Sequence, residues 1–415
     1  MLVVCAPPFA LFANLPPPVL PYPTALGRLL AQRFDWGTER VPLAEAGGRV
    51  LAEDLLADRD QPPFDRVAMD GVAIDHRAYA AGRRRFRVAG VLAAGEAATA
   101  LPEAGACVEV MTGAVLPTGA TAVVRYERIS REGGAVRVAE ELPAGADIHT
   151  RGRDAAAGQV LAPAGRRIGL GEVGTLATCG YAEVAVRRLP RATIIATGTE
   201  LVPVGAAAAP HQIRASNVVQ LRHLLREAGA EPDTELLRDD RAVLRKRISA
   251  LLATHELLIL TGGVSRGRHD HLPEVLVECG VRPLFHRVAQ RPGKPLWAGR
   301  TDTALVLAMP GNPLAVIACA LAYLGPYLRA GLGLPAPPRQ ARTLSRDLPA
   351  KPDFTTFLTV DAPPGTDVAT PVRHAGSGDL ASLLRTSGLL QLPAGRTGHY
   401  RAGERLAYLP LDSLL

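Results

Sequence analysis

The sequence lacks most of the patterns that mark common catalytic sites. Its 415 residues contain five cysteines, which lie far apart and form no Cys-x-x-Cys pair, so a zinc or dithiol site of the usual spacing is excluded. There is no Walker A motif, no G-x-G-x-x-G motif after a strand pattern, and no Ser-His-Asp signature. Unpaired cysteines of this kind are typical of a reducing compartment, which predicts a cytoplasmic protein.

Aromatic residues and long apolar runs are also scarce. Aromatics make up only 4% of the chain and the arginines are scattered, so no stacking platform for nucleic acid is expected. Prolines interrupt the apolar residues 1–24, which favours a Pro-rich tail over a signal peptide. No other stretch has the roughly 18 uninterrupted apolar residues that a membrane span needs. We therefore expect neither nucleic acid nor a membrane as a partner.

The chain carries a net positive charge. Lysine and arginine total 47 against 40 aspartate and glutamate residues, which gives a formal charge of +7. Such a balance fits nucleic acid, an anionic lipid or a phosphorylated small molecule, and it does not choose among them.

The residue pattern changes twice along the first half of the chain. Apolar spacing of three and four residues between about 25 and 57 predicts two amphipathic helices. Short β-type runs separated by glycine and proline predict a β-rich domain at 61–146. Residues 147–190 then resemble a strand, a helix from about Leu170 and another strand, which could rejoin the first helices. The β-rich domain would then be an insertion into a discontinuous domain.

The second half shows the cleanest pattern. Between residues 191 and 334, apolar strands alternate with helical segments, which predicts a parallel α/β sheet with helices on both faces. A Pro/Gly linker follows, and short β-type stretches predict a small barrel or sandwich at 335–415.

Three loops follow predicted strands of the α/β segment, at 197–200, 261–265 and 310–313. Ligands of parallel sheets bind beyond the carboxyl ends of the strands, where glycines let the backbone approach a phosphate. A nearby carboxylate, such as Glu200 or Asp270, would repel that phosphate unless a cation lay between them, which is the argument for Mg²⁺. For any one loop alone, a simple tight turn is the competing interpretation.

Other polar residues stand at predicted turns. Arg291 and Lys294 lie in the Pro-flanked turn QRPGKP, where fixed cations suit a compact oxyanion, although a solvated basic turn is the commoner explanation. Asp239 and Asp240 follow another strand, where a helix N-cap is the alternative role. The residues alone thus predict an Mg²⁺-assisted anion or nucleotide site on an α/β domain.

Two further polar residues lie in the β-rich segment. Asp70 stands beside a glycine, and Thr112 follows a β-type run. Neither has a charged partner nearby in the sequence, so an Asx-turn and a hairpin are the alternatives to a functional role.

Nine motifs, in order, resemble the MoeA family of molybdopterin molybdenumtransferases, which is related to the gephyrin E domain. The resemblance covers about residues 25–415 and rests on PPFDRVAMDGVAI, VMTGAVLPTGATAVV, RGRDAAAGQVL, TIIATGTEL, IRASNVVQL, TGGVSRGRHD, RPGKP, MPGNPLAV and GSGDLASLL.

The resemblance implies a four-part subunit that forms a homodimer. Its parts would be an elongated discontinuous domain (25–60 with 147–190), the β-rich insertion (61–146), a molybdopterin-binding α/β domain (191–334) and a C-terminal β-barrel (335–415). The active cleft would lie between the α/β domain of one subunit and the β-rich domain of the other. The implied reaction takes adenylylated molybdopterin and molybdate, inserts molybdenum at the dithiolene and releases AMP with Mg²⁺.

The resemblance also assigns roles to individual residues. The catalytic residues would be Asp70, Thr112, Glu200, Asp239 and Asp270, of which Glu200, Asp239 and Asp270 would hold the metal. The substrate-binding residues would be Gly262, Gly263 and Ser265 for the phosphate or AMP, Arg291, Lys294 and Ser377 for molybdate, and Asp154.

The chain departs from the family pattern at several positions. Thr199 and Ala215 stand where the family has aspartate, Arg291 replaces a lysine, Ala315 replaces a small hydroxyl residue, and an expected arginine is missing near Thr356. The alternative function is therefore a non-catalytic paralogue that binds molybdopterin or an anion, or acts as a dimeric scaffold. A nucleotide-processing enzyme that shares only the α/β domain fits less well, because the flanking motifs also match.

Overall fold

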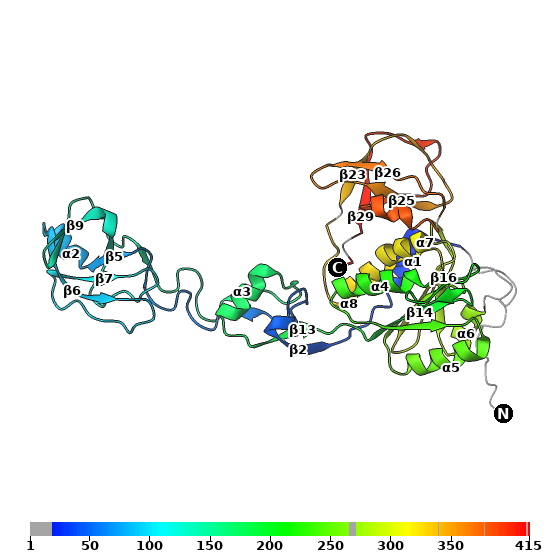
Figure 1. Cartoon of the computed structure of the whole chain (residues 1–415), viewed down its shortest axis with the longest axis horizontal. Coiled ribbons are helices and arrows are strands. Elements are labelled where there is room, and N and C mark those ends of the chain that lie inside the picture. Colours follow the sequence, from blue (N-terminus) through cyan, green and yellow to red (C-terminus); the bar gives the residue numbers. More distant parts are fainter. Residues whose placement is uncertain (1–18, 265–270, 339, 377, 412–413) are drawn as a thin grey trace, which may run out of the picture. The chain divides into compact units, whose positions relative to one another are not determined.

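The computed structural model describes residues 19–264, 271–338, 340–376, 378–411 and 414–415. The chain divides into two compact units (Figure 1). The first combines the chain up to Glu39 with Gly48–Val50 and Val186–Leu415, and the second comprises Arg40–Gly47 and Leu51–Ala185.

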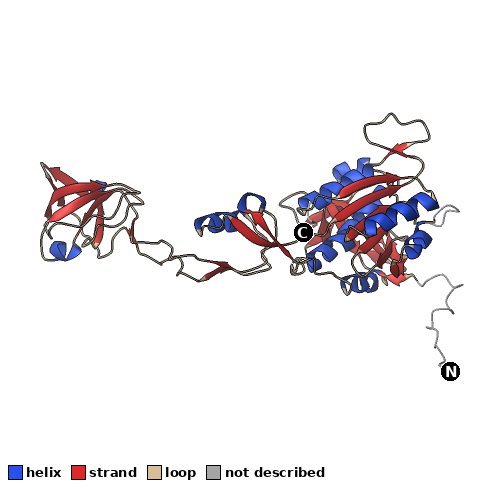
Figure 2. Ribbon diagram, turned by 90° about the horizontal axis from the view of Figure 1, so that it is seen from below, coloured by secondary structure: helices blue, strands red, loops and turns tan. Residues whose placement is uncertain are grey.

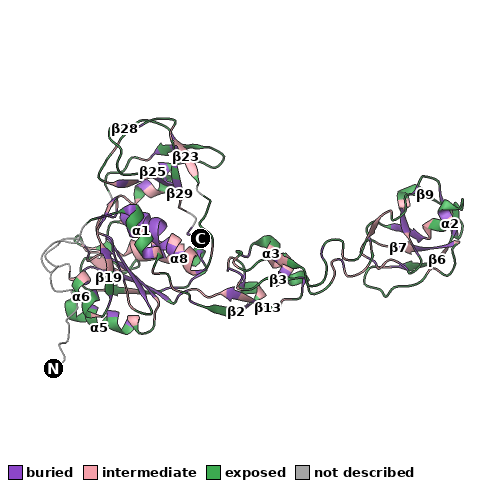
Figure 3. Cartoon of the chain, turned by 180° about the vertical axis from the view of Figure 1, so that it is seen from behind, coloured by how far each residue is buried: buried purple, intermediate pink, exposed green. Residues whose placement is uncertain are grey.

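A six-stranded sheet forms the centre of the first unit. Its order is β17 (Asp233–Leu237), β14 (Ala192–Thr197), β18 (Leu257–Thr261), β22 (Leu305–Met309), β21 (Trp297–Arg300) and β19 (Arg282–His286). The first four strands are parallel, as the sequence predicts, whereas β21 is antiparallel to both of its neighbours, β22 and β19. The reversal arises because β22 follows β21 after a short turn. The central strands are buried on both faces, which explains their uninterrupted apolar residues (Figure 3).

Helices cover both faces of this sheet (Figure 2). One face packs against α1 (Tyr22–Leu30), α4 (Ser216–Glu227) and the segment made of α7 (Pro313–Cys319), a π-helical turn (Ala320–Leu324) and α8 (Gly325–Gly331). The other face packs against α5 (Arg241–Leu252) and α6 (Leu272–Glu278). Asp240 caps α5, because its carboxylate accepts a hydrogen bond from the Val243 amide at 2.9 Å; the N-cap interpretation of Asp240 is therefore confirmed.

The continuous helix Pro313–Gly331 is long and apolar enough to cross a membrane by length and composition alone. However, 78% of its apolar window is buried inside the unit, against the sheet and α1. This burial is what the core helix of a globular domain shows.

The C-terminal segment forms a closed five-stranded barrel. Each strand pairs with two others in the cycle β25 (Thr355–Asp361), β26 (Val368–Pro371), β23 (Ala341–Leu344), β29 (Arg405–Pro410) and β27 (Gly388–Leu392). The barrel also carries the pair β24 (Leu348–Pro349) and β28 (His399–Tyr400) and the 3-10 turn Ala381–Arg385.

Two short strands extend the barrel sheet. β20 (Val288–Arg291) pairs in parallel with β25, and β1 (Leu20–Pro21) pairs with β20. The segment that follows β19 therefore leaves the α/β sheet and joins the barrel sheet, before the chain returns to β21.

The second unit contains a six-stranded sheet in the β-rich segment. Its order is β8 (Ala122–Arg125), β5 (Gly71–Ile74), β7 (Ala106–Val110), β6 (Arg85–Leu92), β10 (Ala135–Val138) and β9 (Ile129–Glu132). Two apolar clusters of buried residues involve these strands; one of them includes Tyr79 of α2 (His76–Ala80).

Paired strands and one helix complete the chain. The pairs are β2 (Thr38–Pro42) with β13 (Glu183–Arg187), β3 (Leu55–Leu56) with β12 (Val160–Ala162), β4 (Arg66–Val67) with β11 (Ile148–His149), and β15 (Leu201–Val202) with β16 (Ile213–Arg214). The helix expected from Leu170 is α3 (Leu170–Thr178).

One of the two helices predicted before residue 57 is wrong. The first is α1, but residues 43–57 contain the 3-10 turn Leu43–Glu45 and the strand β3 and no α-helix. Gly48 has a φ of +80°, a left-handed conformation that interrupts a helix and that glycine adopts without strain. The multidomain α/β and β-barrel fold class is confirmed.

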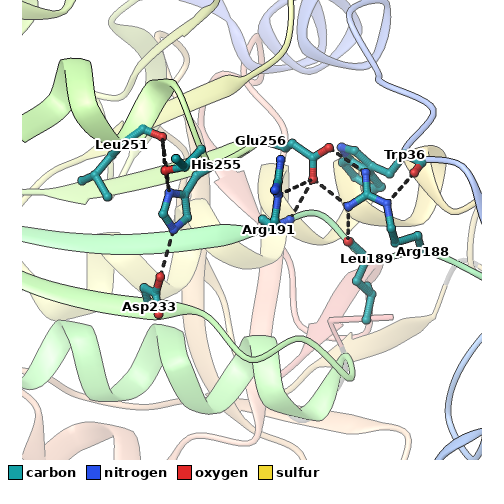
Figure 4. Close-up of polar contacts among 9 residues, drawn as sticks. Trp36, Arg188, Leu189, Arg191, Asp233, Leu251, His255 and Glu256 are labelled. Atoms are coloured by element: carbon teal, nitrogen blue, oxygen red, sulfur yellow. Dashed lines mark hydrogen bonds and ion pairs between the residues drawn. The ribbon is translucent and has the colours of Figure 1, made fainter. Parts of the chain in front are cut away.

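An ion-pair cluster lies at the amino ends of the α/β strands, just before β18 (Figure 4). Glu256 accepts two hydrogen bonds from the Arg188 guanidinium, at 2.6 and 2.8 Å, and one from the Arg191 amide at 3.0 Å. Arg188 also donates to the Trp36 carbonyl at 2.7 Å. The cluster thereby joins three separate segments of the first unit.

Candidate active site

Two adjoining cavities of about 410 and 530 Å³ lie at the carboxyl ends of the parallel strands. They share Gly262, Gly311 and Asn312, so together they form one cleft. The smaller cavity is bordered by the 262–264 loop and the turn from Gln290 to Pro295, and the larger by the loop after β14 and the start of α4. The structure thus brings the three predicted strand-end loops together.

Gly262 and Gly263 make close approaches that no larger residue could make. Both have positive φ angles, +93° and +68°. A Cβ on Gly262 would lie 2.4 Å from the Thr197 carbonyl oxygen, and one on Gly263 would lie 3.0 Å from the Thr197 hydroxyl. The Gly262 amide donates to the Met309 carbonyl at 3.1 Å, so Gly262 contributes space to the cleft rather than a free donor.

Two helix N-termini open on the larger cavity. Ser216 and Asn217 begin α4, while Asn312 and Pro313 begin the buried helix, and all four line the cavity. The Asn217 amide donates to the Gly311 carbonyl at 2.7 Å, which ties the two loops together. Helix N-termini carry partial positive charge and favour anionic ligands. The sequence argument overlooked Asn217, although its place at a helix start after a strand was a usable signal.

Arg291 and Lys294 line the smaller cavity. The Arg291 guanidinium lies 4.6 Å, and the Lys294 ammonium 5.4 Å, from the centre of the Phe354 ring. Neither cation makes an ion pair with a carboxylate among the residues that the structure describes. No carboxylate of the described ranges therefore competes with an anion for these two charges.

The turn that carries these two cations has a buried polar anchor. Gln290 is fully buried, and its side-chain amide donates to the Pro292 carbonyl at 3.1 Å and contacts the Cys319 sulfur at 3.6 Å. The Tyr323 hydroxyl donates to the Gln290 side-chain oxygen. Burial raises the pKa of the Cys319 thiol to about 12, so the anchor carries no charge at neutral pH. Cys319 and Tyr323 both belong to the buried helix Pro313–Gly331, so this helix anchors the turn.

The predicted metal ligands are only partly brought together. Glu200 lines the larger cavity, whereas Asp239 lines neither cavity. Asp270, like Ser265 and Ser377, lies outside the described residues. Within the described ranges there is no group of three or more His, Cys, Asp or Glu residues that could hold a metal ion.

Asp70 and Thr112, in the second unit, contact each other across 42 residues of sequence. The Thr112 amide and hydroxyl both donate to one Asp70 carboxylate oxygen, at 2.7 and 2.8 Å. These hydrogen bonds, the amide's first, hold the pKa of Asp70 below its usual range, so the carboxylate is charged at neutral pH. Asp154 accepts a hydrogen bond from His149 at 2.8 Å, and the other ring nitrogen of His149 contacts Arg66 at 3.0 Å.

This fold, with a cleft at the strand ends of a three-layer domain, is that of a molybdopterin-binding domain. Residues 193–330 match the family model described as "Probable molybdopterin binding domain". Residues 20–180 match the MoeA N-terminal region (domain I and II), and residues 341–411 match the MoeA C-terminal region (domain IV). The chain belongs to the MoeA family.

Individual relatives agree with this assignment. The chain is 34% identical over 365 residues to a molybdopterin molybdenumtransferase of Synechocystis. The aligned region covers 86% of this chain and 91% of the relative. It is 31% identical to one of Staphylococcus epidermidis, over 92% of this chain and 93% of the relative. The crystal structure of a molybdopterin biosynthesis MoeA protein from Pyrococcus horikoshii matches with a TM-score of 0.80 at 28% identity, over 95% of this chain and 100% of that one. The family resemblance read from the motifs is confirmed.

Proposed function

We propose that the chain inserts molybdenum from molybdate into adenylylated molybdopterin and releases AMP. Its relatives show that the chain is a transferase that inserts molybdenum in molybdenum cofactor biosynthesis. None of the relatives reported above favours the non-catalytic paralogue. The observation that carries the proposal is the cleft, in which two helix N-termini and two cations meet at the glycine loop.

The cleft has distinct surroundings for the two substrates. The larger cavity, with the starts of α4 and α7, suits the phosphate groups, because backbone donors and helix dipoles favour negative charge there. The smaller cavity, with Arg291 and Lys294, suits a tetrahedral oxyanion, because cationic donors make strong hydrogen bonds to anionic oxygens. In this proposal these residues bind and orient the two reactants next to each other.

Magnesium is a further part of the proposal. Glu200 is the described carboxylate at the larger cavity, and Mg²⁺ commonly binds through one or two carboxylates together with substrate phosphates. Glu200, with Asp239 and Asp270 as the other proposed ligands, would hold the ion beside the phosphate oxygens. Bound there, Mg²⁺ would offset the negative charge of those oxygens.

We also propose that the protein works as a cytoplasmic homodimer. In this arrangement the Asp70–Thr112 pair of one copy would complete the cleft of the other, which would give a role to a charged carboxylate that is exposed in the single chain.

The decisive experiment measures AMP release from adenylylated molybdopterin by the purified protein with Mg²⁺, in the presence and absence of molybdate. We expect molybdate-dependent release that a chelator of Mg²⁺ abolishes. Tight binding of the substrate without any release of AMP would establish the non-catalytic paralogue instead.

The substitution Asp70→Asn tests the role of the second unit. Asparagine keeps an acceptor for the Thr112 donors, so we expect an unchanged melting temperature and a fall in AMP release of about 10²-fold, in the range for loss of a positioned charged group. Asp75→Asn is the matched control, because Asp75 also accepts a backbone hydrogen bond, from Arg77 at 2.9 Å, as the cap of α2. Equal activities of the two variants would remove Asp70 from the site.

A further inference from the structure

A groove of about 770 Å³ lies at one edge of the α/β sheet and shares none of its described lining residues with the cleft. It is lined by α6 and β19, together with Leu20 of β1 and Trp297 of β21 (Figure 3). β19 is the outermost strand of its sheet, and its outer edge has no strand partner among the described residues. An open edge of this kind is a template for pairing with another segment, and native proteins usually cover it.

The charged residues of the groove largely pair with one another. Arg241 donates to the Glu274 carboxylate at 3.0 Å and forms a second ion pair with Glu278. Arg28 is exposed, so its guanidinium can stay in water while its stem lines the groove. The apolar lining includes Pro273, Val277, Pro283, Leu284 and Phe285. A groove with this lining suits an uncharged, apolar occupant.

The chain itself carries such a segment directly before the groove. Residues 1–18 lie outside the described residues, and two positions later Leu20 lines the groove. Residues 1–18 contain no Asp, Glu, Lys or Arg, and Phe9, Leu11 and Phe12 stand in a stretch without proline, residues 9–13. Seven residues separate Ala13 from Leu20 and can span up to about 25 Å, whereas the five residues of β19 span about 17 Å. Residues 9–13 can therefore reach any part of β19.

We propose that residues 1–18 dock into this groove of their own chain, with residues 9–13 packed against Val277 and the edge strand β19. The segment is tethered at the groove by Leu20, so its effective concentration there is high and a modest apolar contact suffices to hold it. Docking would cover Val277, whose side chain is 50% exposed, and the open edge of β19. Both features would otherwise favour association with other chains.

The test is limited digestion of the full-length protein with chymotrypsin, which cleaves after Phe9 and Phe12, with the released peptides followed by mass spectrometry. Val277→Asp places an unpaired carboxylate beneath the docked side chains, which disfavours docking. Cleavage follows the undocked fraction when docking is fast. We therefore expect cleavage at these two sites to be at least about tenfold slower in the wild type than in the variant.

Val243→Asp is the matched control. Val243 is 45% exposed on the neighbouring helix α5 and does not line the groove, so its variant should be cleaved within twofold of the wild-type rate. Equal rates in the wild type and in Val277→Asp would overturn the proposal. Protection that disappears when the protein is diluted would also overturn it, because the groove would then hold the segment of a second copy.

An apolar dye gives a second measurement on the full-length chain. The double variant Phe9→Ser and Phe12→Ser should leave the groove open, so we expect at least about twofold more fluorescence from 1-anilinonaphthalene-8-sulfonate than with the wild type. Adding Val277→Asp to the double variant should remove this increase, because the dye would bind at the groove. A double variant that binds no more dye than the wild type would contradict docking. Neither measurement uses the pterin substrate, so the outcome is independent of the proposed function.

Discussion

Gly293→Ala is expected to destabilise the first unit by about 2–6 kcal/mol and to abolish the proposed binding of molybdate. Gly293 has a φ of +98°, and a Cβ there would lie 2.4 Å from the Gln290 side-chain nitrogen and 2.7 Å from the Cys319 sulfur. Both neighbours are buried and cannot move aside, so the cost combines backbone strain of about 1–3 kcal/mol with overpacking of about 1–3 kcal/mol. The turn that carries Arg291 and Lys294 would lose its position. Calorimetric melting and equilibrium dialysis measure the two effects.

Gly395→Ala is the control for this prediction. Gly395 has a φ of +89°, but a Cβ there would meet no atom within 4 Å. Alanine at this position therefore brings the backbone strain without the clash, and the substitution should lower the unfolding free energy by only about 1 kcal/mol. If both variants lost the same unfolding free energy, the packing of Gly293 against Gln290 would not be what holds the turn in place.

Glu256→Gln is the second substitution with a large expected effect, a loss of about 2–4 kcal/mol of unfolding free energy at pH 7. The Glu256 side chain is 17% exposed and accepts three hydrogen bonds from Arg188 and Arg191. The neutral glutamine leaves the half-buried Arg188 guanidinium without its counter-charge, and the loss of a partner from such a pair is costly. Chemical denaturation of wild type and variant gives the difference.

The effect of Glu256 should depend on pH in one direction. Hydrogen bonding from Arg188, and then from the Arg191 amide, holds the pKa of Glu256 below its usual value of about 4.3. Because the folded-state pKa is lowered, the contribution of Glu256 is fully present above that usual value and is lost as the pH falls through the folded-state pKa. The two proteins should therefore differ by a constant amount near neutrality and converge in acid.

Glu231→Gln is the matched control for Glu256. Arg226 and then Arg222 lower the pKa of Glu231 to about 2, but its side chain is 61% exposed. Solvent screens such a surface pair, so its loss should change the unfolding free energy very little. A large effect at Glu231 would contradict burial as the reason that Glu256 matters.

The sequence predicts features that depend on local pattern and composition. The uninterrupted apolar run before Thr261 reveals a strand buried on both faces, and the glycines after it reveal a close backbone approach. Because parallel strands end at one edge of a sheet, the meeting of the three loops could also be anticipated. The helix predicted after residue 42 is absent from the structure. The prediction gave the apolar spacing more weight than the glycine pair at 47 and 48, which interrupts a helix.

Long-range pairing could not be predicted from a single sequence. Asp70 and Thr112 have no charged partner nearby in the chain, yet each is the other's hydrogen-bond partner. In the same way, only the ladder between β20 and β25 places Arg291 directly opposite Thr356. The chain also leaves the α/β sheet through β20 between β19 and β21, so the antiparallel place of β21 beside β19 could not be read from the alternation of elements.

The ladder between β20 and β25 makes the C-terminal barrel inseparable from the cleft. Gln290 and Arg291 pair with Thr355 and Thr356, so the base of the turn that carries Arg291 and Lys294 is an inner strand of the barrel sheet. A chain shortened after residue 334 would leave β20 with one edge unpaired and Phe354 missing from beneath both cations. The boundary that looks like a simple linker in the sequence is therefore a poor place to cut, and the minimal functional piece of this half of the protein includes the barrel.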